Sequence, residues 1–370
     1  MPDTGEKRLA SLDVFRGATI AAMILVNNPG SWEFVYPPLR HASWHGWTPT
    51  DLIFPFFLFI VGIALSLSLS RRRERESGEG SVLSKVLRRS MILFALGLLL
   101  ALFPRFDFAG LRIPGVLQRI AVCYLIGSLV FLKTRTRGRI VTTVGLLAAY
   151  WAVLRWVPVP GYGAGVLTLE GNLCGWLDAK LLGGHLYTPH FDPEGILSTF
   201  PAVATVLLGT LAGDGLRAAV RPWIRLWGLI AGGAALAAAG LWLHGFFPIN
   251  KQLWTSSFVL FTAGAACLAL GIFYGLVDVL RWRRWALPFL VFGSNAILVF
   301  VGSGFLARVL QLIRVQSAGE SIPLKAYLYS RWLAPWAGPM LGSLLFPLAL
   351  LLFWFWLLYP LFRKRIYLRI

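Results

Sequence analysis

Cysteine is scarce in this chain of 370 residues, which contains only Cys123, Cys174 and Cys267. The three are far apart and form no recognisable motif, and two of them fall in apolar runs. We therefore expect neither a disulfide framework nor a zinc site. Acidic residues are also few, since 16 Asp and Glu stand against 35 Lys and Arg and give a formal net charge of +19.

Hydrophobic residues make up 57% of the sequence, and the mean hydropathy is +0.69. A soluble domain is usually about 45–50% apolar. Repeated apolar runs of roughly 20 residues predict an integral membrane protein in a lipid bilayer. The basic excess, which in a soluble chain would suggest nucleic acid, is then better explained by membrane topology. We expect no nucleic-acid partner.

The apolar runs predict an all-α, polytopic helical bundle of about ten transmembrane helices in a single domain, residues 1–370. We expect the spans near 13–30, 51–70, 88–103, 115–132, 139–157, 196–213, 224–246, 253–276, 286–306 and 341–362. The polar breaks between spans alternate in basic content, and the positive-inside rule therefore places both termini in the cytoplasm. This topology predicts a flexible cytoplasmic linker at 71–87 and a long outer loop at 158–195.

A histidine-bearing polar segment, 40–51, directly precedes the apolar run 52–69. The imidazole of His41 could act as a base or nucleophile near neutral pH, although a loop histidine is ordinarily just solvated. His41 and His45 could share a metal on a helix, but Pro37-Pro38 and Gly46 favour a loop. We expect no metal there.

Asp51 allows two compatible interpretations. Thr48, Pro49 and Asp51 fit the N-cap, first and third positions of a helix, so Asp51 could belong to a capping box. Its carboxylate could also orient the imidazole of His41, as in a catalytic triad. Asn27, at the end of the first span, could finish the helix or point its amide at a substrate.

Other polar residues need an explanation at the membrane boundary. In the outer loop, His190, Asp192 and Glu194 could bind a metal, but hydrogen bonding to a polar substrate is the favoured interpretation. Gln118 and Arg119 lie inside the fourth span and should face the bundle interior, because a lipid-exposed Arg is costly. Arg16 shares a helix face with Asp13, which is typical of a structural ion pair.

Eight short strings carry a resemblance that runs in the same order over some 290 residues. They are Ser11–Gly17 (SLDVFRG), Val26-Asn27, His41–Trp44 (HASW), Asp51–Pro55 (DLIFP), Gly115–Arg119 (GVLQR), Asp192–Leu197 (DPEGIL), Pro248–Trp254 (PINKQLW) and Asn295–Val299 (NAILV). With these strings the chain resembles the membrane-embedded catalytic region of heparan-α-glucosaminide N-acetyltransferase and its bacterial relatives.

The resemblance implies transfer of acetyl from cytoplasmic acetyl-CoA to the amino group of glucosamine, or a related amino sugar, across a bacterial inner membrane. It implies that His41, Asp51 and Asn27 are catalytic, with acetyl-CoA as co-substrate, no metal, and a homodimeric assembly. We assign Arg16, Gln118 and Arg119 to donor binding. The expected acceptor contacts are Trp44, His45, His190, Asp192, Glu194, Asn250 and Lys251.

Two chemical routes stay open at this point. His41 could attack the thioester and carry the acetyl group, or it could act as general base in a direct transfer. The alternative from another functional class is a transporter of N-acetylglucosamine or a related sugar, since many spans with inward polar residues also fit that class. Acyl transfer to a different envelope amine or hydroxyl is a third interpretation.

Overall fold

The computed structural model describes residues 9–75, 79–317 and 319–368, which are mostly helical. Its residue contacts divide the chain into two compact units. The first unit takes in residues up to 37, 220–230 and 267 onward, and the second takes in 38–219 and 231–266. Two helices, α8 (Pro222–His244) and α9 (Ser256–Tyr274), run from one unit into the other.

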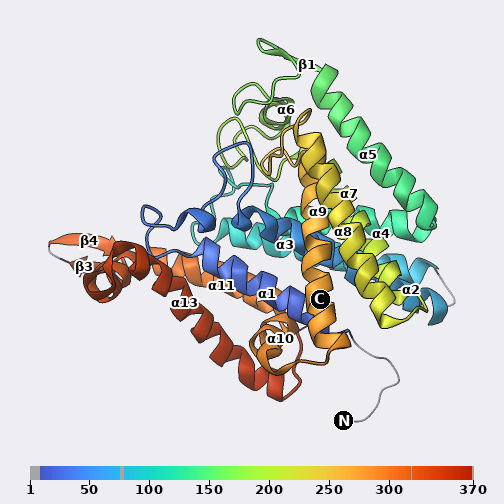
Figure 1. The fold of residues 1–370 in the computed structure, drawn as a ribbon. Coiled ribbons are helices and arrows are strands. Elements are labelled where there is room, and N and C mark those ends of the chain that lie inside the picture. The colour runs from blue at the N-terminus through green and yellow to red at the C-terminus, as the bar shows by residue number, and fades with distance from the viewer. Residues whose placement is uncertain (1–8, 76–78, 318, 369–370) are drawn as a thin grey trace. The chain divides into compact units, whose positions relative to one another are not determined.

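In the first unit, helix α1 (Ala10–Asn27) lies among three other helices, which Figure 1 shows around the blue ribbon. Its inner face packs Val14 against Val277 and Ala286 in a fully buried cluster. The other elements are η3 (Gly275–Val279), η4 (Arg284–Ala286), α10 (Leu287–Ser294), α11 (Ala296–Leu312), β3 (Arg314–Ser317), β4 (Glu320–Pro323), α12 (Leu324–Tyr327), η5 (Leu328–Leu333) and α13 (Ala334–Arg363). Strands β3 and β4 form an antiparallel hairpin after α11.

Asn295 marks a sharp break in the predicted span 286–306. The helical stretches on either side of it, Arg284–Ser294 and Ala296–Leu312, are bent by 72°. The Asn295 amide donates to the carbonyl of Ile366 at 3.1 Å, and its Oδ1 accepts the N–H of Leu368 at 2.8 Å. The side chain thus satisfies backbone groups of the C-terminal segment, which would otherwise lack partners once the helix has ended.

The second unit contains most of the polar residues singled out from the sequence. Its elements are η2 (Pro49–Leu52), α2 (Ile53–Arg75), α3 (Glu79–Leu102), α4 (Val116–Lys133), α5 (Thr136–Trp156), β1 (Pro158–Val159), β2 (Gly163–Ala164), α6 (Leu173–Leu182) and α7 (Ile196–Arg217). A short 3₁₀ turn, η1 (Pro37–Leu39), stands at the junction of the two units.

Helix α7 is central to the second unit, because it contacts α2, α4, α5 and α6. It packs most closely on α2, where Gly62 faces Val206 and Gly209 faces Phe59. A Cβ at either glycine would collide with a backbone carbonyl of the other helix. Small residues allow helix backbones to approach in this way, which suits association inside a bilayer.

An apolar cluster connects the outer loop to the ends of α5 and α8. It is built around Tyr150, Cys174, Phe191, Phe247 and Leu253, with Trp44 packed against it. The Tyr150 hydroxyl donates to the carbonyl of Leu253. Through this cluster the segments 40–51 and 247–254 pack against the same set of buried side chains.

Seven helices of the described residues are long and apolar enough to cross a membrane, or eight if the bent pair at Asn295 is one span. The prediction of about ten spans is therefore not confirmed. All ten predicted spans coincide with helices, but α3 and α5 are too polar or too charged for this count. In α3, for example, Arg88 and Arg89 add charge to the segment.

The predicted flexible linker, 71–87, differs in the structure. Residues 71–75 continue α2 and residues 79–87 open α3, while 76–78 lie outside the described residues. Arg, Glu, Lys and Leu are good helix formers, so a charged sequence of this composition can extend a helix beyond its apolar part.

Candidate active site

Asp51 and His41 form the centre of the candidate site in the second unit. Pro49 opens the short helix η2, and Asp51 in its first turn is 1% exposed. Its Oδ2 accepts the backbone N–H groups of Ala42 and Thr48, both at 3.0 Å. The contact with Thr48 is the reciprocal half of the predicted capping box. One carboxylate oxygen therefore fixes the loop, and the other is left for a second partner.

That second partner is the imidazole of His41, whose Nδ1 lies 2.7 Å from Asp51 Oδ1. A carboxylate can only accept, so Nδ1–H donates and Nε2 keeps its lone pair. The His41 side chain is 45% exposed, whereas Asp51 is buried. This arrangement leaves an oriented nitrogen base at an accessible position.

Lys251 completes the constellation from the segment between α8 and α9. Its Nζ lies 3.3 Å from Asp51 Oδ1, 2.9 Å from His41 Nδ1 and 3.5 Å from His41 Nε2. A donor on the in-plane lone pair of one ring nitrogen would lie far from the other nitrogen. Because Nζ is close to both, it lies over the face of the imidazole ring.

Two opposing effects act on the charge of Lys251. Burial lowers its pKa, while the negative charges of Asp51 and Glu194 act in the opposite direction. In its charged form, Lys251 places a positive charge beside the buried Asp51 carboxylate and the imidazole ring of His41.

Asn250 holds the two segments of the site together. Its Oδ1 accepts the N–H of Leu253 at 2.8 Å, and its Nδ2 lies 3.3 Å from His45 Nδ1. The N–H of Gly46 also donates to the carbonyl of Ile249 at 2.8 Å. Burial and the neighbouring His244 lower the pKa of His45, which favours its neutral form.

Trp44 fixes the other side of the loop. Its indole N–H donates to the carbonyl of Leu167 at 2.7 Å, and its ring meets Phe191 edge to face at 5.6 Å. The half-buried indole is therefore anchored to the outer loop.

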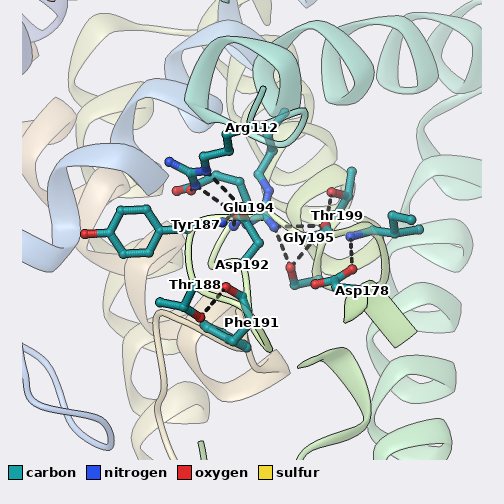
Figure 2. Close-up of polar contacts among 12 residues, drawn as sticks. Arg112, Asp178, Tyr187, Thr188, Phe191, Asp192, Glu194, Gly195 and Thr199 are labelled. Carbon is teal, nitrogen blue, oxygen red and sulfur yellow. Dashed lines mark hydrogen bonds and ion pairs between the residues drawn. The ribbon is translucent and has the colours of Figure 1, made fainter. Parts of the chain in front are cut away.

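An ion-pair cluster organises the chain before α7. Figure 2 shows Arg112 reaching Asp192 and Glu194, with the ring of Tyr187 beside the guanidinium. The two bonds from Arg112 to Asp192 measure 2.7 and 2.8 Å, and the bond to Glu194 measures 2.5 Å. Burial works against the charge of Arg112, but both carboxylates favour it, so its pKa is raised.

Asp192 has no oxygen left over for a substrate in this arrangement. Besides Arg112, it accepts the N–H of Tyr187 at 2.8 Å and the N–H of Glu194 at 2.9 Å. A carboxylate with four donors is saturated, so Asp192 shapes the loop. Its predicted acceptor contact would require these bonds to open.

Arg119, at the start of α4, is buried beneath this cluster with 2% exposure. Its Nη2 donates to the carbonyl of Gly195 at 3.2 Å and to Ser198 Oγ, and its guanidinium lies 5.2 Å from the ring centre of Trp254. Its Nε and Nη1 have no hydrogen-bond partner in the described part of the chain. Gln118, also buried, lines the same pocket as Arg119, and both side chains face the interior as predicted.

Comparison with known proteins identifies the relatives of this chain. A family model described as "Heparan-alpha-glucosaminide N-acetyltransferase, catalytic" matches residues 8–232. The chain belongs to this family. It is 32% identical over 357 residues to the heparan-alpha-glucosaminide N-acetyltransferase of Homo sapiens, with 80% of this chain and 52% of the relative covered. The Mus musculus protein of that name is 30% identical over 357 residues, with 80% and 53% covered.

The chain spans about half the length of these N-acetyltransferases. The family match covers His41, Asp51 and Arg112, whereas Lys251 lies beyond it. The family expected from the sequence is therefore confirmed.

Three further predicted site residues are described by their own surroundings. Arg16 and Asn27 belong to the first unit, where Arg16 makes the expected ion pair with Asp13 at 3.1 Å. Asn27 is exposed at the end of α1, and the buried amide there is that of Asn28, which donates to Ile24 O at 2.9 Å. His190 is exposed in the outer loop. The described residues contain no cluster of His, Cys, Asp or Glu suited to a metal ion.

Sequence reasoning missed Arg112 and Trp254. Arg112 lies in a loop without periodicity, and its partners follow 80 residues later, so no local pattern marks it. Trp254 is part of a family string, but its ring contact with Arg119 joins distant parts of the chain and is not encoded in that local string. One sequence signal did point to Arg112. A cation near the membrane boundary needs a partner, and the outer loop contains two carboxylates, Asp192 and Glu194.

Proposed function

We propose that this protein is a membrane acetyltransferase that moves acetyl from acetyl-CoA to the amino group of glucosamine or a related amino sugar. The observation that carries the proposal is the buried Asp51 carboxylate on Nδ1 of an accessible His41, in a chain of this family. The same paired geometry activates imidazole in other acyl-transfer enzymes.

In the first step, the free Nε2 of His41 attacks the carbonyl carbon of the thioester. A C–N bond forms, the C–S bond breaks, and the CoA thiolate leaves with the electron pair. The acetylated ring carries a positive charge, which the buried Asp51 stabilises through Nδ1–H.

In the second step, the sugar amine attacks the acetyl carbon and expels neutral His41. The amine loses its surplus proton to solvent, which reaches the half-exposed imidazole. In the direct route, Nε2 instead takes the amine proton while the amine attacks the thioester. Acetyl label on the protein in the absence of acceptor distinguishes the two routes.

The remaining assignments complete the proposal. Acetyl-CoA approaches from the cytoplasm of a bacterial inner membrane, both termini are cytoplasmic, and the chain acts as a homodimer. Asn27 donates to the developing oxyanion and Arg16 contacts the donor. Trp44, His45, His190 and Lys251 meet the acceptor, with Asn250 holding His45. These assignments rest on the family resemblance and on the alternation of basic loops.

The test is transfer of radiolabelled acetyl from acetyl-CoA to glucosamine by the purified protein in lipid nanodiscs. Wild type and the matched control His185→Ala, whose ring contacts the carbonyl of Leu111 at 2.8 Å, should both produce labelled N-acetylglucosamine, and His41→Ala should not. If no variant makes product from glucosamine or a panel of amino sugars, while proteoliposomes take up N-acetylglucosamine, the protein is a transporter instead.

A further inference from the structure

A pocket of about 280 Å³ lies beside the site in the second unit and has no part in the chemistry described above. Most of its lining is apolar and comes from α3, α4, α7 and the outer loop, with Phe94, Val122 and Val203 among the residues. Its polar part consists chiefly of Gln118, Arg119 and Glu194. The pocket is thus amphipathic.

The apolar part opens toward the bilayer. Ile126 on α4 and Phe200 on α7 line it, and they are 37% and 50% exposed on helices apolar enough to span the membrane. Large apolar side chains exposed on such helices face hydrocarbon. A lipid-like chain could therefore enter sideways from the membrane.

The polar part adjoins the His41 site. Arg119 lines the pocket and lies 5.2 Å from the ring centre of Trp254, whose backbone N–H donates to the carbonyl of Lys251 at 3.1 Å. Gln118 and Arg119 line the same polar part, although Nε and Nη1 of Arg119 are closed off from solvent. An amide and a carboxylate at one end of an apolar pocket favour a ligand with a polar, hydrogen-bonding head group.

We propose that the acceptor is an amphiphile, an amino sugar joined to a hydrocarbon chain, with the chain in this pocket and the sugar toward His41. This inference rests on the proposed function and names its substrate class. It assigns Gln118 and Arg119, expected from the sequence to contact the donor, to the acceptor instead. The apolar lining suits a hydrocarbon chain better than a pantetheine arm, whose two amides need hydrogen-bond partners along its length.

The experiment compares acetyl transfer to methyl, butyl and hexyl glucosaminides, which are water-soluble, with the enzyme in nanodiscs. Each methylene that becomes buried should raise kcat/KM by up to about fourfold. The quantity to compare is the ratio of kcat/KM for the hexyl and methyl compounds within each variant. Partition into the bilayer would raise this ratio for any enzyme, so variants must separate the two causes.

Val122→Phe fills the pocket from α4. It should lower the hexyl-to-methyl ratio of kcat/KM to about the value that partition into the bilayer alone produces. Leu129→Phe introduces the same side chain on the same helix outside the pocket lining and should keep the wild-type ratio. If Val122→Phe fails to fold, Thr199→Phe on α7 is the second variant. An equal ratio in wild type, Val122→Phe and Leu129→Phe would overturn the inference.

The outcomes also separate this inference from the proposed function. No transfer to any glucosaminide would refute the function itself. Transfer without chain-length dependence would refute only the amphiphilic acceptor. A rise in KM for acetyl-CoA in Val122→Phe, with the ratio unchanged, would assign the pocket to the donor arm.

Discussion

At the scale of single residues, the two oxygens of the Asp51 carboxylate have different roles: one holds the loop backbone and the other contacts the imidazole of His41. Oδ2 holds the backbone of Ala42 and Thr48, and Oδ1 meets His41 Nδ1. The sequence allowed a capping role and an orienting role, and the geometry shows both contacts at once. A rigid helix start is a good place for a catalytic carboxylate, because its position costs no reorganisation during the reaction.

Asp51→Asn should lower kcat by about 10³-fold with little change in KM. The amide can donate to Nδ1, which would place the ring proton on Nε2 and remove the nucleophilic lone pair. Steady-state kinetics on both substrates measure this effect. Asp107→Asn, an exposed loop carboxylate, is the matched control. A loss confined to KM would show that Asp51 binds substrate without orienting His41.

Lys251→Met should lower kcat/KM, because it removes the cation that lies 3.3 Å from the buried Asp51 carboxylate and 2.9 Å from His41 Nδ1. The buried carboxylate would then have less compensating charge beside it. Lys251→Arg retains the charge and should keep more of the activity. Steady-state kinetics measure both variants, and an unchanged kcat/KM in Lys251→Met would remove Lys251 from the electrostatics of the site.

At the scale of elements, the start of α7 is held from three sides. Asp178 on α6 accepts the N–H of Ile196 at 2.9 Å, Arg119 on α4 binds the carbonyl of Gly195, and Asp192 binds the N–H of Glu194. Figure 2 shows Asp178 and Gly195 side by side, and a side chain at 195 would collide with that carboxyl. Glycine is therefore required at this contact.

Asp178 makes stability depend on pH. Burial raises its pKa from 3.8 to about 6, so the folded state holds a proton that the unfolded state releases. Stability should then fall as pH rises from about 4 to about 6. Asp178→Asn should flatten this part of the dependence, as followed by thermal unfolding in detergent. An unchanged slope in Asp178→Asn, equal to that of Asp107→Asn, would contradict the assignment.

Local sequence patterns predicted contacts close in the chain better than distant ones. The pair His41 and Asp51 could be expected from its spacing of ten residues and the cap at Thr48. The placement of Lys251 over His41 could not, because 210 residues separate them and a lysine carries no directional signal. Within the predicted linker, residues 71–75 and 79–87 are helical, in keeping with the helix preference of Arg and Glu, while 76–78 lie outside the described residues.

At the scale of the whole molecule, the proposed function requires a donor and an acceptor on opposite sides of a membrane. The described residues contain seven helices long and apolar enough to span it, or eight with the bent pair, and the alternating basic loops predict which ends are cytoplasmic. The side of the membrane on which the segments between α3 and α5 lie depends on whether these two helices cross it.

Cysteine labelling tests that topology. The native Cys123, Cys174 and Cys267 are buried, so an exposed new cysteine dominates labelling by an impermeant maleimide. Asp107→Cys, between α3 and α4, should react from outside the cell. Arg137→Cys, at the start of α5, should react only after the membrane is opened. Labelling of both from the same side would show that α4 does not span as predicted.

Chemical rescue of His41→Ala is the most direct measurement of the central claim, that the imidazole of His41 performs acetyl transfer. The account predicts that His41→Ala loses about 10³-fold in kcat and that added imidazole restores part of the rate, because the site is open to solvent. The rescue should saturate with imidazole and should be absent in the double variant His41→Ala/Asp51→Ala. A His41→Ala enzyme that transfers acetyl at the wild-type rate would contradict the account.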